Sequence, residues 1–488
     1  MKLRKVLMDI PILEMSGSDE LDILGITHSS KAVRPGYLFA ALKGEKKDGM
    51  DFAAEAESLG ASAVLSEWPK PARTGIAWIR VADAREALAL SAANFYSHPS
   101  LKLKIVGITG TKGKTTTTYL LEEILRTAGF IPGVIGTVDY RGPGFKVQAG
   151  RTTPEAPELQ KMLQEMVDEG VSHCLLEVSS HALEQKRVWG VSFDVVVFTN
   201  LSGEHLDYHG SMENYFEAKK KLFFLNHKRN ASVVNIDDPW GQRLMTELPM
   251  KTITFGLDPK AIVRAERFEF HDDGMNFLMD FPGGRVAVSS ALIGKHNLYN
   301  ILAAASVALA MNIPLPAIVR GIGSLRGVPG RFETVKNDRG IQIIVDYAHT
   351  DNALQYLLET VQELKPRRVL LVFGAGGNRD KSKRERMGEV ASRLADWSIL
   401  TSDNPRSEDP LAIIGDIEKG FHKRESANYE VVPDRKEAIR RALGMAGKGD
   451  YVLVAGKGHE DYQIFKDRTV RFSDVEVIQS LLAETDAG

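Results

Sequence analysis

The sequence is poor in cysteine and in net charge, and each shortage excludes a class of protein. Its single cysteine, Cys174, cannot form an internal disulfide, and its place in the apolar run HCLLEV predicts a buried, inert thiol. The net charge of −2, with 26% charged residues, lacks the basic excess of a nucleic-acid or membrane-surface binder. We therefore expect a cytoplasmic protein that binds small molecules and no nucleic acid.

Export signals and long apolar runs are also scarce. The N-terminal MKLRKVLMDI opens with positive charge, but Asp9 and Pro11 end its apolar part too early for a secretion signal. The uncharged stretch 297–319 is divided by three asparagines and two prolines. This division predicts a buried helix over 301–311, and no membrane insertion is expected.

The chain alternates strand-like and helix-like segments in three series, which predicts an α/β fold. In the middle series the strands are apolar throughout, as in an open parallel sheet. Between 252 and 290, short strands separated by Asp-Asp-Gly and Pro-Gly-Gly predict an antiparallel excursion. We expect three domains, at 1–100, 101–329 and 330–488. Strands are predicted at 37–42, 63–67, 77–81, 173–179, 193–200, 341–348, 368–377, 397–405, 429–434 and 451–458, with helices from Ala84 and over 115–128.

The most informative segment is KIVGITGTKGKTTTT, residues 104–118, in which a β-branched run enters a glycine loop and continues as a helix. Gly110 and Gly113 allow backbone N–H groups to face an anion, Lys114 adds a positive charge, and Thr115 offers a hydroxyl to Mg²⁺. The strict P-loop spacing is missed by one residue, because Ile108 stands where the first glycine is expected. The segment therefore predicts a variant nucleotide-phosphate loop rather than a simple connection.

Three further features lie downstream of this loop. Glu177 ends a predicted strand, where a nucleotide-binding domain keeps a magnesium-holding acid; the alternative is a capping charge. The loop TNLSGEHLDYHG, residues 199–210, carries Glu204, His205, Asp207 and His209, a density that favours a functional site. Lys219, by contrast, stands in a lysine run on an amphipathic helix, and its spacing alone is typical of a solvated face.

Ten short motifs together resemble the Mur ligases, and most closely those that add the third residue of the peptidoglycan stem peptide. Each motif alone is weak, but their order along the chain is specific. The match runs from about residue 38 to the C-terminus and is weakest in the first hundred residues. The motifs are TGTKGKTT, TTPE (152–155), EVSSHAL (177–183), TNLSGEHLDYHG, YFEAK (215–219), GKHNLYN (294–300), GRFE (330–333), DYAHT (346–350), DNPR (403–406) and AGKGHEDYQ (455–463).

The resemblance implies a cytoplasmic, monomeric amide ligase of three α/β domains. A small N-terminal domain would hold the uridine nucleotide, a central P-loop-like ATPase would hold ATP, and a C-terminal Rossmann-like domain would bring the amino acid. ATP would activate the D-glutamyl carboxylate of UDP-MurNAc-L-Ala-D-Glu as an acyl phosphate, which the incoming amine displaces. Lys114, Mg²⁺ and the loop N–H groups would neutralise charge on the transferring phosphoryl group.

The resemblance also implies the residues at each substrate. Lys219 would become a carbamate that helps to hold a second Mg²⁺, with Thr115, Glu177 and His205 as the other metal candidates. At the predicted uridine contact Ser29 this chain departs from its relatives, which usually read Asp-Ser-Arg where it has His28, Ser29 and Ser30. The ATP contacts would be Gly110, Thr111, Lys112, Gly113, Lys114, Thr115, Thr116, Asn297, Asn300, Arg331 and Asp346, and the uridine-substrate contacts Ser29, Thr152, Thr153, Ser179, Gln185 and Arg187.

The motif DNPR bears on the choice of amino acid. Arg406 offers a planar fork for the second carboxylate of meso-diaminopimelate, which lysine lacks. The alternative is that Arg406 merely pairs with Glu408 or Asp409. The implied pocket is Arg379, Asp403, Asn404, Pro405, Arg406, Gly456 and Glu460.

Three other functions stay open at this stage. A lysine-adding ligase of the same family and a folylpolyglutamate synthetase share the ligation chemistry. A non-enzymatic nucleotide-binding regulator is the third, although it would be expected to lose Lys114, Glu177, His205 or Lys219, which are all present. A surface role for Arg331, at a linker, is a further alternative.

Overall fold

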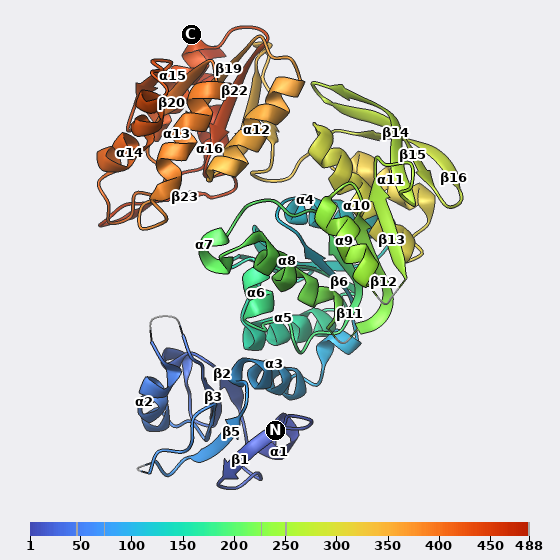
Figure 1. The fold of residues 1–488 in the computed structure, drawn as a ribbon, viewed down its shortest axis with the longest axis vertical. Coiled ribbons are helices and arrows are strands. Elements are labelled where there is room, and N and C mark those ends of the chain that lie inside the picture. The colour runs from blue at the N-terminus through green and yellow to red at the C-terminus, as the bar shows by residue number, and fades with distance from the viewer. Residues whose placement is uncertain (45–46, 73, 226, 249–250, 487–488) are drawn as a thin grey trace. The chain divides into compact units, whose positions relative to one another are not determined.

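The structure, a computed structural model, describes residues 1–44, 47–72, 74–225, 227–248 and 251–486 (Figure 1). By residue contacts it divides into two compact units, Met1–Arg264 with Asn300–Gly321, and Ala265–Tyr299 with Ile322–Gly488. Three separate multistranded sheets, each with its own helices, agree with the predicted three-domain α/β class. The exact domain boundaries stay a prediction.

The N-terminal sheet has five strands in the order β1-β5-β4-β3-β2, parallel except for β1. Alternate side chains of its strands enter two cores, since Leu38 and Leu65 pack on one face and Phe39 and Val64 on the other. Asp83 caps α3 by accepting from the Glu86 backbone N–H. The elements are α1 (Leu3–Val6), β1 (Ile12–Ser16), β2 (Gly25–Thr27), β3 (Tyr37–Ala41), α2 (Ala53–Ser58), β4 (Ala63–Ser66), β5 (Ala77–Val81) and α3 (Ala84–Phe95).

The central sheet has eleven strands in the order β16-β15-β14-β13-β12-β11-β6-β10-β7-β8-β9. Its strands are β6 (Lys104–Thr109), β7 (Pro132–Ile135), β8 (Asp139–Gly142), β9 (Phe145–Gln148), β10 (His173–Glu177), β11 (Phe193–Phe198), β12 (His227–Asn235), β13 (Thr252–Gly256), β14 (Val263–His271), β15 (Gly274–Phe281) and β16 (Gly284–Ser290). Its helices are α4 (Lys114–Thr127), α5 (Ala156–Asp168), α6 (Ser180–Glu184), α7 (Leu206–His209), α8 (Met212–Lys220), α9 (Pro239–Glu247), α10 (Lys295–Ala310) and α11 (Leu315–Ser324).

The prediction of a parallel middle sheet is right only for its inner strands. From β7 to β14 each pair is parallel, whereas β8 and β9 form an antiparallel extension that the sequence did not predict. The predicted antiparallel excursion is present, because β15 pairs antiparallel with β16. The helix expected over 301–311 begins six residues earlier, at Lys295.

The C-terminal sheet runs β17-β18-β22-β19-β20-β21, with only β17 antiparallel. Helices α12, α13 and α14 pack on one face and α15 and α16 on the other, as in a doubly wound fold (Figure 1). The elements are β17 (Glu333–Val335), β18 (Gln342–Asp346), α12 (Asp351–Glu363), β19 (Arg368–Phe373), α13 (Ser382–Leu394), β20 (Trp397–Leu400), α14 (Pro410–Lys423), β21 (Tyr429–Val431), α15 (Arg435–Met445), β22 (Asp450–Ala455), β23 (Tyr462–Ile464), β24 (Thr469–Arg471) and α16 (Asp474–Asp486).

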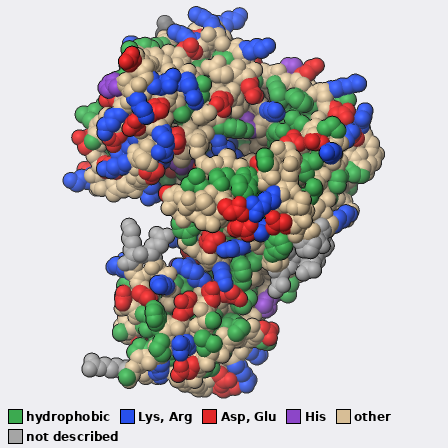
Figure 2. Space-filling model, viewed as in Figure 1, with side chains coloured by type: hydrophobic (Ala, Val, Ile, Leu, Met, Phe, Trp, Pro, Cys, Tyr) green, Lys and Arg blue, Asp and Glu red, His purple; other side chains and the backbone are tan. Residues whose placement is uncertain are grey.

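The surface and the core agree with the composition. Acidic and basic side chains are interspersed over the face that Figure 2 shows, in keeping with the net charge of −2. Cys174 is buried in β10, where burial raises the pKa of its thiol to about 12. Within the described part of the chain, no helix combines the length and apolar character that a membrane span requires.

Candidate functional site

The glycine loop joins β6 to α4, as the sequence predicts. Gly110 has φ +146°, and a Cβ there would lie 1.9 Å from Thr199 Oγ1. Gly113 has φ +88°, and its Cβ would lie 2.3 Å from Asn300 Oδ1. Both positions therefore require glycine for close approach as well as for backbone conformation. Asn300, a predicted ATP contact, lies directly against this glycine loop.

Two lysines from distant parts of the chain meet at this loop. Lys114 Nζ donates to the Gly110 and Thr111 carbonyl oxygens at 2.9 and 3.0 Å, and Lys219 Nζ donates to Gly110 O at 2.8 Å. Lys219 is 1% exposed, so the solvated-face interpretation is wrong. Burial lowers the pKa of Lys219 well below its usual range, and the charge of Lys114 lowers it further.

Glu177 lies at the end of β10, beside β6 in the sheet, and its carboxylate binds hydroxyls from two segments. Its Oε2 accepts from Thr115 Oγ1 at 3.1 Å and from Thr137 Oγ1 at 2.8 Å, while its Oε1 accepts from the Thr137 backbone N–H. Glu177 is 1% exposed. The sequence analysis did not single out Thr137, which lies outside the ten motifs.

The donor set at this point fits Mg²⁺. Thr115 and Glu177 present a buried hydroxyl and a buried carboxylate within hydrogen-bond distance, and Mg²⁺ prefers oxygen ligands. Among the described residues, no three His, Cys, Asp or Glu side chains converge as a metal cluster. A bound ion would therefore also need oxygens from substrate phosphates or from a modified side chain.

His205 precedes α7 in a left-handed conformation, with φ +58°. Burial lowers the pKa of His205 to about 4, against the opposing effect of the Glu204 charge, so its imidazole is neutral near pH 7. Its ring lies edge-on to His181, with centroids 5.0 Å apart. His209 instead binds Ser180 Oγ through Nε2 at 2.9 Å and stacks on Tyr215, which is a structural role.

Five of the six predicted uridine-substrate residues are connected to Glu177, directly or through hydrogen bonds of Thr153 and Thr137. Thr153 Oγ1 donates to Glu177 O at 2.8 Å and accepts from the Ser179 backbone N–H at 3.1 Å. Arg187 donates to Thr153 O at 2.9 Å and to Gln185 Oε1 at 2.6 Å. Thr152 Oγ1 lies 3.1 Å from Thr137 Oγ1. The sixth residue, Ser29, belongs to the N-terminal sheet, where its backbone N–H donates to Thr27 Oγ1 just after β2.

The other predicted ATP contacts are held locally. Asn297 Nδ2 donates to Ile293 O at 2.9 Å. The Asp346 carboxylate accepts from the Phe332 backbone N–H at 2.7 Å, which ties DYAHT to GRFE. The Arg331 guanidinium lies over the Tyr347 ring at 5.1 Å, and its Nε is buried without a hydrogen bond to the described residues. A plain surface role for Arg331 therefore does not fit.

A polar cluster lies where β20 and β22 end. Asn404 Nδ2 donates to Glu460 Oε2 at 2.8 Å, and Gly456, with φ +115°, lies so close that a Cβ would be 2.9 Å from Asp403 Oδ2. Lys457, 0% exposed in its side chain, lies 3.1 Å from Glu460 Oε2 and 3.7 Å from Asp403 Oδ1. The sequence reasoning missed Lys457, although it stands inside the motif AGKGHEDYQ.

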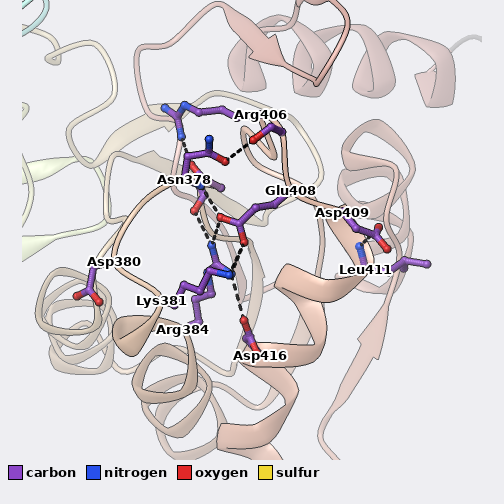
Figure 3. Close-up of polar contacts among 12 residues, drawn as sticks. Asn378, Asp380, Lys381, Arg384, Arg406, Glu408, Asp409, Leu411 and Asp416 are labelled. Atoms are coloured by element: carbon purple, nitrogen blue, oxygen red, sulfur yellow. Dashed lines mark hydrogen bonds and ion pairs between the residues drawn. The ribbon is translucent and has the colours of Figure 1, made fainter.

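Arg406 and Arg379 flank one glycine on the neighbouring loop. A Cβ at Gly376 would lie 3.0 Å from Arg406 Nη1 and 3.8 Å from Arg379 Cγ. Arg406 donates to Gly377 O at 2.8 Å, whereas Glu408 pairs with Arg384 (Figure 3).

Asp409, the other acid proposed as an alternative partner of Arg406, accepts from the Leu411 backbone N–H and caps α14. Both acids are therefore engaged elsewhere, Glu408 with Arg384 and Asp409 with the first turn of α14. Pro405 also contacts the loop, because a Cβ at Gly377 would lie 1.9 Å from its carbonyl oxygen.

Comparison with known proteins gives three family matches in chain order. The model described as Mur ligase family, catalytic domain, matches residues 22–96, the Mur ligase middle domain matches 108–308, and the Mur ligase, glutamate ligase domain, matches 330–458. A UDP-N-acetylmuramoyl-L-alanyl-D-glutamate--2,6-diaminopimelate ligase of Geobacter metallireducens is 44% identical and covers 96% of each chain. One from Clostridium tetani is 41% identical, over 99% of this chain and 100% of its own.

Solved structures give the same picture. The structure of a ligase with that same name has a TM-score of 0.71 at 32% identity, covering 100% of this chain and 99% of its own. MurF ligase from Thermotoga maritima, in complex with ADP, has a TM-score of 0.62 at 22% identity, over 96% and 99% of the two chains. Escherichia coli FolC, in complex with DHPP and ADP, has 0.58 at 20%, over 81% and 92%. These last two share the fold alone.

Proposed function

Because this chain belongs to the Mur ligase family, we propose that it joins meso-2,6-diaminopimelate to UDP-N-acetylmuramoyl-L-alanyl-D-glutamate in peptidoglycan precursor synthesis. It is an ATP-dependent acid–amino-acid ligase that releases ADP and phosphate. The observation that carries this function is the near-complete alignment, at 44% identity, with a ligase of that name. Its nucleotide substrates suit a cytoplasmic enzyme, and we expect a monomer.

The reaction forms one amide bond in two transfers. The D-glutamyl carboxylate attacks the γ-phosphorus of ATP, and the bond to ADP breaks. The amine of diaminopimelate then attacks the acyl carbon, phosphate leaves with the bonding electrons, and the amine loses a proton. Because the substrate carboxylate is itself the nucleophile, the protein's task is to place the reactants and neutralise charge.

The phosphate loop supplies much of that neutralisation. Lys114 Nζ is held at the loop between β6 and α4 by its hydrogen bonds to Gly110 O and Thr111 O. The backbone N–H groups of this loop add to its positive charge. Each well-aimed donor at such a site is worth about 3 kcal/mol in the transition state. Asn300, against Gly113, restricts the space beside the loop and suits a nucleotide contact.

Mg²⁺ would be held by Thr115 and Glu177, with His205 nearby and with Lys219 as a carbamate. Bound Mg²⁺ supplies positive charge to the phosphoryl oxygens. The environment of Lys219 favours carbamylation, because burial lowers its pKa and so increases the fraction of neutral amine. The neutral amine is the form that adds to carbon dioxide. The product is an anionic oxygen ligand of the kind Mg²⁺ prefers.

The contacts with the uridine substrate and with ATP are those that the resemblance to the Mur ligases implies. The linked residues Thr152, Thr153, Ser179, Gln185 and Arg187 contact the uridine substrate, next to Glu177 and hence next to the reacting carboxylate. Ser29 belongs to the N-terminal sheet and would contact the uridine end. Asn297, Arg331 and Asp346 contact ATP.

The pocket of Arg379, Asp403, Asn404, Pro405, Arg406, Gly456 and Glu460 receives diaminopimelate. Arg406 is the residue that separates this substrate from lysine, because its fork matches the distal carboxylate. Its contacts with Gly377 leave Glu408 and Asp409 to other partners, which supports a substrate role for the guanidinium.

Phosphate release tests the reaction class. The purified protein with Mg-ATP is expected to release phosphate with UDP-MurNAc-L-Ala-D-Glu and diaminopimelate, and to stay at background with a folate and L-glutamate. Release with the folate instead would assign the chain to the folylpolyglutamate synthetase reaction.

A further inference from the structure

One buried arginine plays no part in the sites described so far. Arg384, on α13, has a side chain only 1% exposed, although it comes from the charged run GGNRDKSKRER. Its two terminal nitrogens donate to the two carboxylate oxygens of Glu408, both at 3.0 Å, and Nη1 also donates to Asp416 Oδ2 at 3.1 Å (Figure 3). A buried guanidinium is costly unless it is paired in this way, so the pairing invites a functional explanation.

The Arg384–Glu408 pair is bonded to the backbone of a pocket loop. Arg384 Nη2 donates to Gly376 O at 3.3 Å, and Glu408 Oε1 accepts from the Asn378 backbone N–H. The pair thus holds the segment 376–378 at both its ends. Arg379, which the proposed function places against the amino acid, is the next residue.

The same segment is bonded to the DNPR loop. The Gly377 backbone N–H donates to Asn404 O at 2.9 Å, and Arg406 Nη1 donates to Gly377 O at 2.8 Å. Asn378 and Arg406 both have left-handed backbones, with φ +55° and +54°. Such conformations of non-glycine residues persist where surrounding contacts impose them.

We propose that Arg384 and Glu408 are positioning residues that lock the 376–379 and 403–406 loops together and so aim Arg379 and Arg406 at the amino acid. This inference rests on the proposed function. Guanidinium forks discriminate only when they are held in the productive geometry, since a shift of about 1 Å can cost about 100-fold. The pair therefore sets the discrimination between diaminopimelate and lysine from outside the pocket.

Charge supports the same view. Hydrogen bonds from Arg384 and then from the Asn378 backbone N–H lower the pKa of Glu408 to about 2. The carboxylate is thus fully ionised at the pH at which the enzyme works.

The test compares Glu408→Gln and Arg384→Met with Arg386→Gln, a control on the same helix as Arg384 that breaks the pair between Arg386 and Asp351 of α12. Glu408→Gln keeps size and shape, whereas Arg384→Met removes the buried charge. We expect both to raise KM for meso-diaminopimelate by about 10- to 100-fold, with KM for ATP and for the uridine substrate changed less than about twofold. The ratio of kcat/KM for meso-diaminopimelate to that for L-lysine should fall in step.

The two replacements together should cost little more than one alone, because they remove the same contact. Arg386→Gln should leave all constants unchanged. If Arg384→Met does not fold, the KM values of Glu408→Gln alone test the positioning role. A lower melting temperature with an unchanged KM for the amino acid, or an equal loss for all three substrates, would overturn the positioning role. A wild-type enzyme that prefers another amino acid overturns the proposed function instead, and the pair is then judged by the KM of that amino acid.

Discussion

Lys114 and Lys219 donate to the same carbonyl oxygen, that of Gly110, at 2.9 and 2.8 Å. They come from the start of α4 and the end of α8, more than a hundred residues apart in the chain. Two ammonium groups that share one acceptor repel each other. Lys219 is buried, so water does not screen or solvate its charge. The relationship favours a neutral or carbamylated Lys219 beside a charged Lys114.

Replacing Lys219 should remove most of the activity. Lys219→Ala would delete the proposed carbamate and its oxygens, so we expect turnover to fall by about 100-fold or more, and added bicarbonate should not restore it. Lys219→Arg is the matched control, since it keeps a cation that cannot form a carbamate, and it should be equally inactive. Near-normal turnover in either variant would exclude a catalytic carbamate. In the wild type, ¹³C-labelled carbon dioxide should give a carbamate NMR signal that Lys219→Arg lacks.

Glu177 should govern the dependence on Mg²⁺. Glu177→Gln keeps the side chain's shape but halves its oxygen ligands and removes its charge, so the Mg²⁺ concentration for half-maximal rate should rise about tenfold or more. Thr137→Val is the comparison, because it removes the hydroxyl's hydrogen bonds to Glu177 and Thr152 but leaves the Glu177 carboxylate in place, and it should give a smaller rise. Unaltered Mg²⁺ dependence in Glu177→Gln would remove this residue from the metal site.

Arg406 should carry the selectivity for the second carboxylate. Arg406→Lys replaces a fork by a single ammonium, which loses one or two charged hydrogen bonds of about 1.5–3 kcal/mol each. We expect kcat/KM for meso-diaminopimelate to fall about 100-fold, while the low value for L-lysine changes little. Equal losses for the two amino acids would mean that Arg406 acts only on loop structure, through its bond to Gly377.

Glu408 should make the protein sensitive to acid. Its pKa lies near 2 in the folded protein, against an ordinary value of 4.5, so the folded state binds fewer protons than the unfolded state between these values. The stability that Glu408 contributes is therefore complete above pH about 4.5 and is lost as pH falls toward about 2. Urea unfolding should show the free-energy gap between wild type and Glu408→Gln narrowing over this range. A constant gap would contradict the pairing with Arg384.

The sequence predicts the sheets best where the pattern is local. The glycine loop between β6 and α4 and the buried strands of the C-terminal sheet are confirmed, because β-branched runs and glycines determine them without distant contacts. Strand β1 and the β8–β9 extension were not predicted. Most side chains of β1 and β9 are exposed, so no apolar alternation marks them. Pairing with a neighbouring strand and one core-packed side chain in each, Met15 and Phe145, hold them in place.

Buried charges are the part of the site that the sequence does not reveal. Lys219, Lys457 and Arg384 each stand among charged or glycine-rich neighbours, a setting typical of solvated positions. Their burial depends on partners far along the chain, such as Gly110 for Lys219 and Glu408 for Arg384. Motif resemblance found the first of these, and only the packing of the folded chain identifies the other two.

A panel of amino acids shows which one the enzyme adds as the third residue of the stem peptide. Purified protein, Mg-ATP and UDP-MurNAc-L-Ala-D-Glu are incubated with meso-diaminopimelate, L-lysine or other diamino acids, and phosphate release and the mass of the product are followed. We expect meso-diaminopimelate to have the highest kcat/KM and to give the tripeptide product. A higher kcat/KM for L-lysine would contradict it.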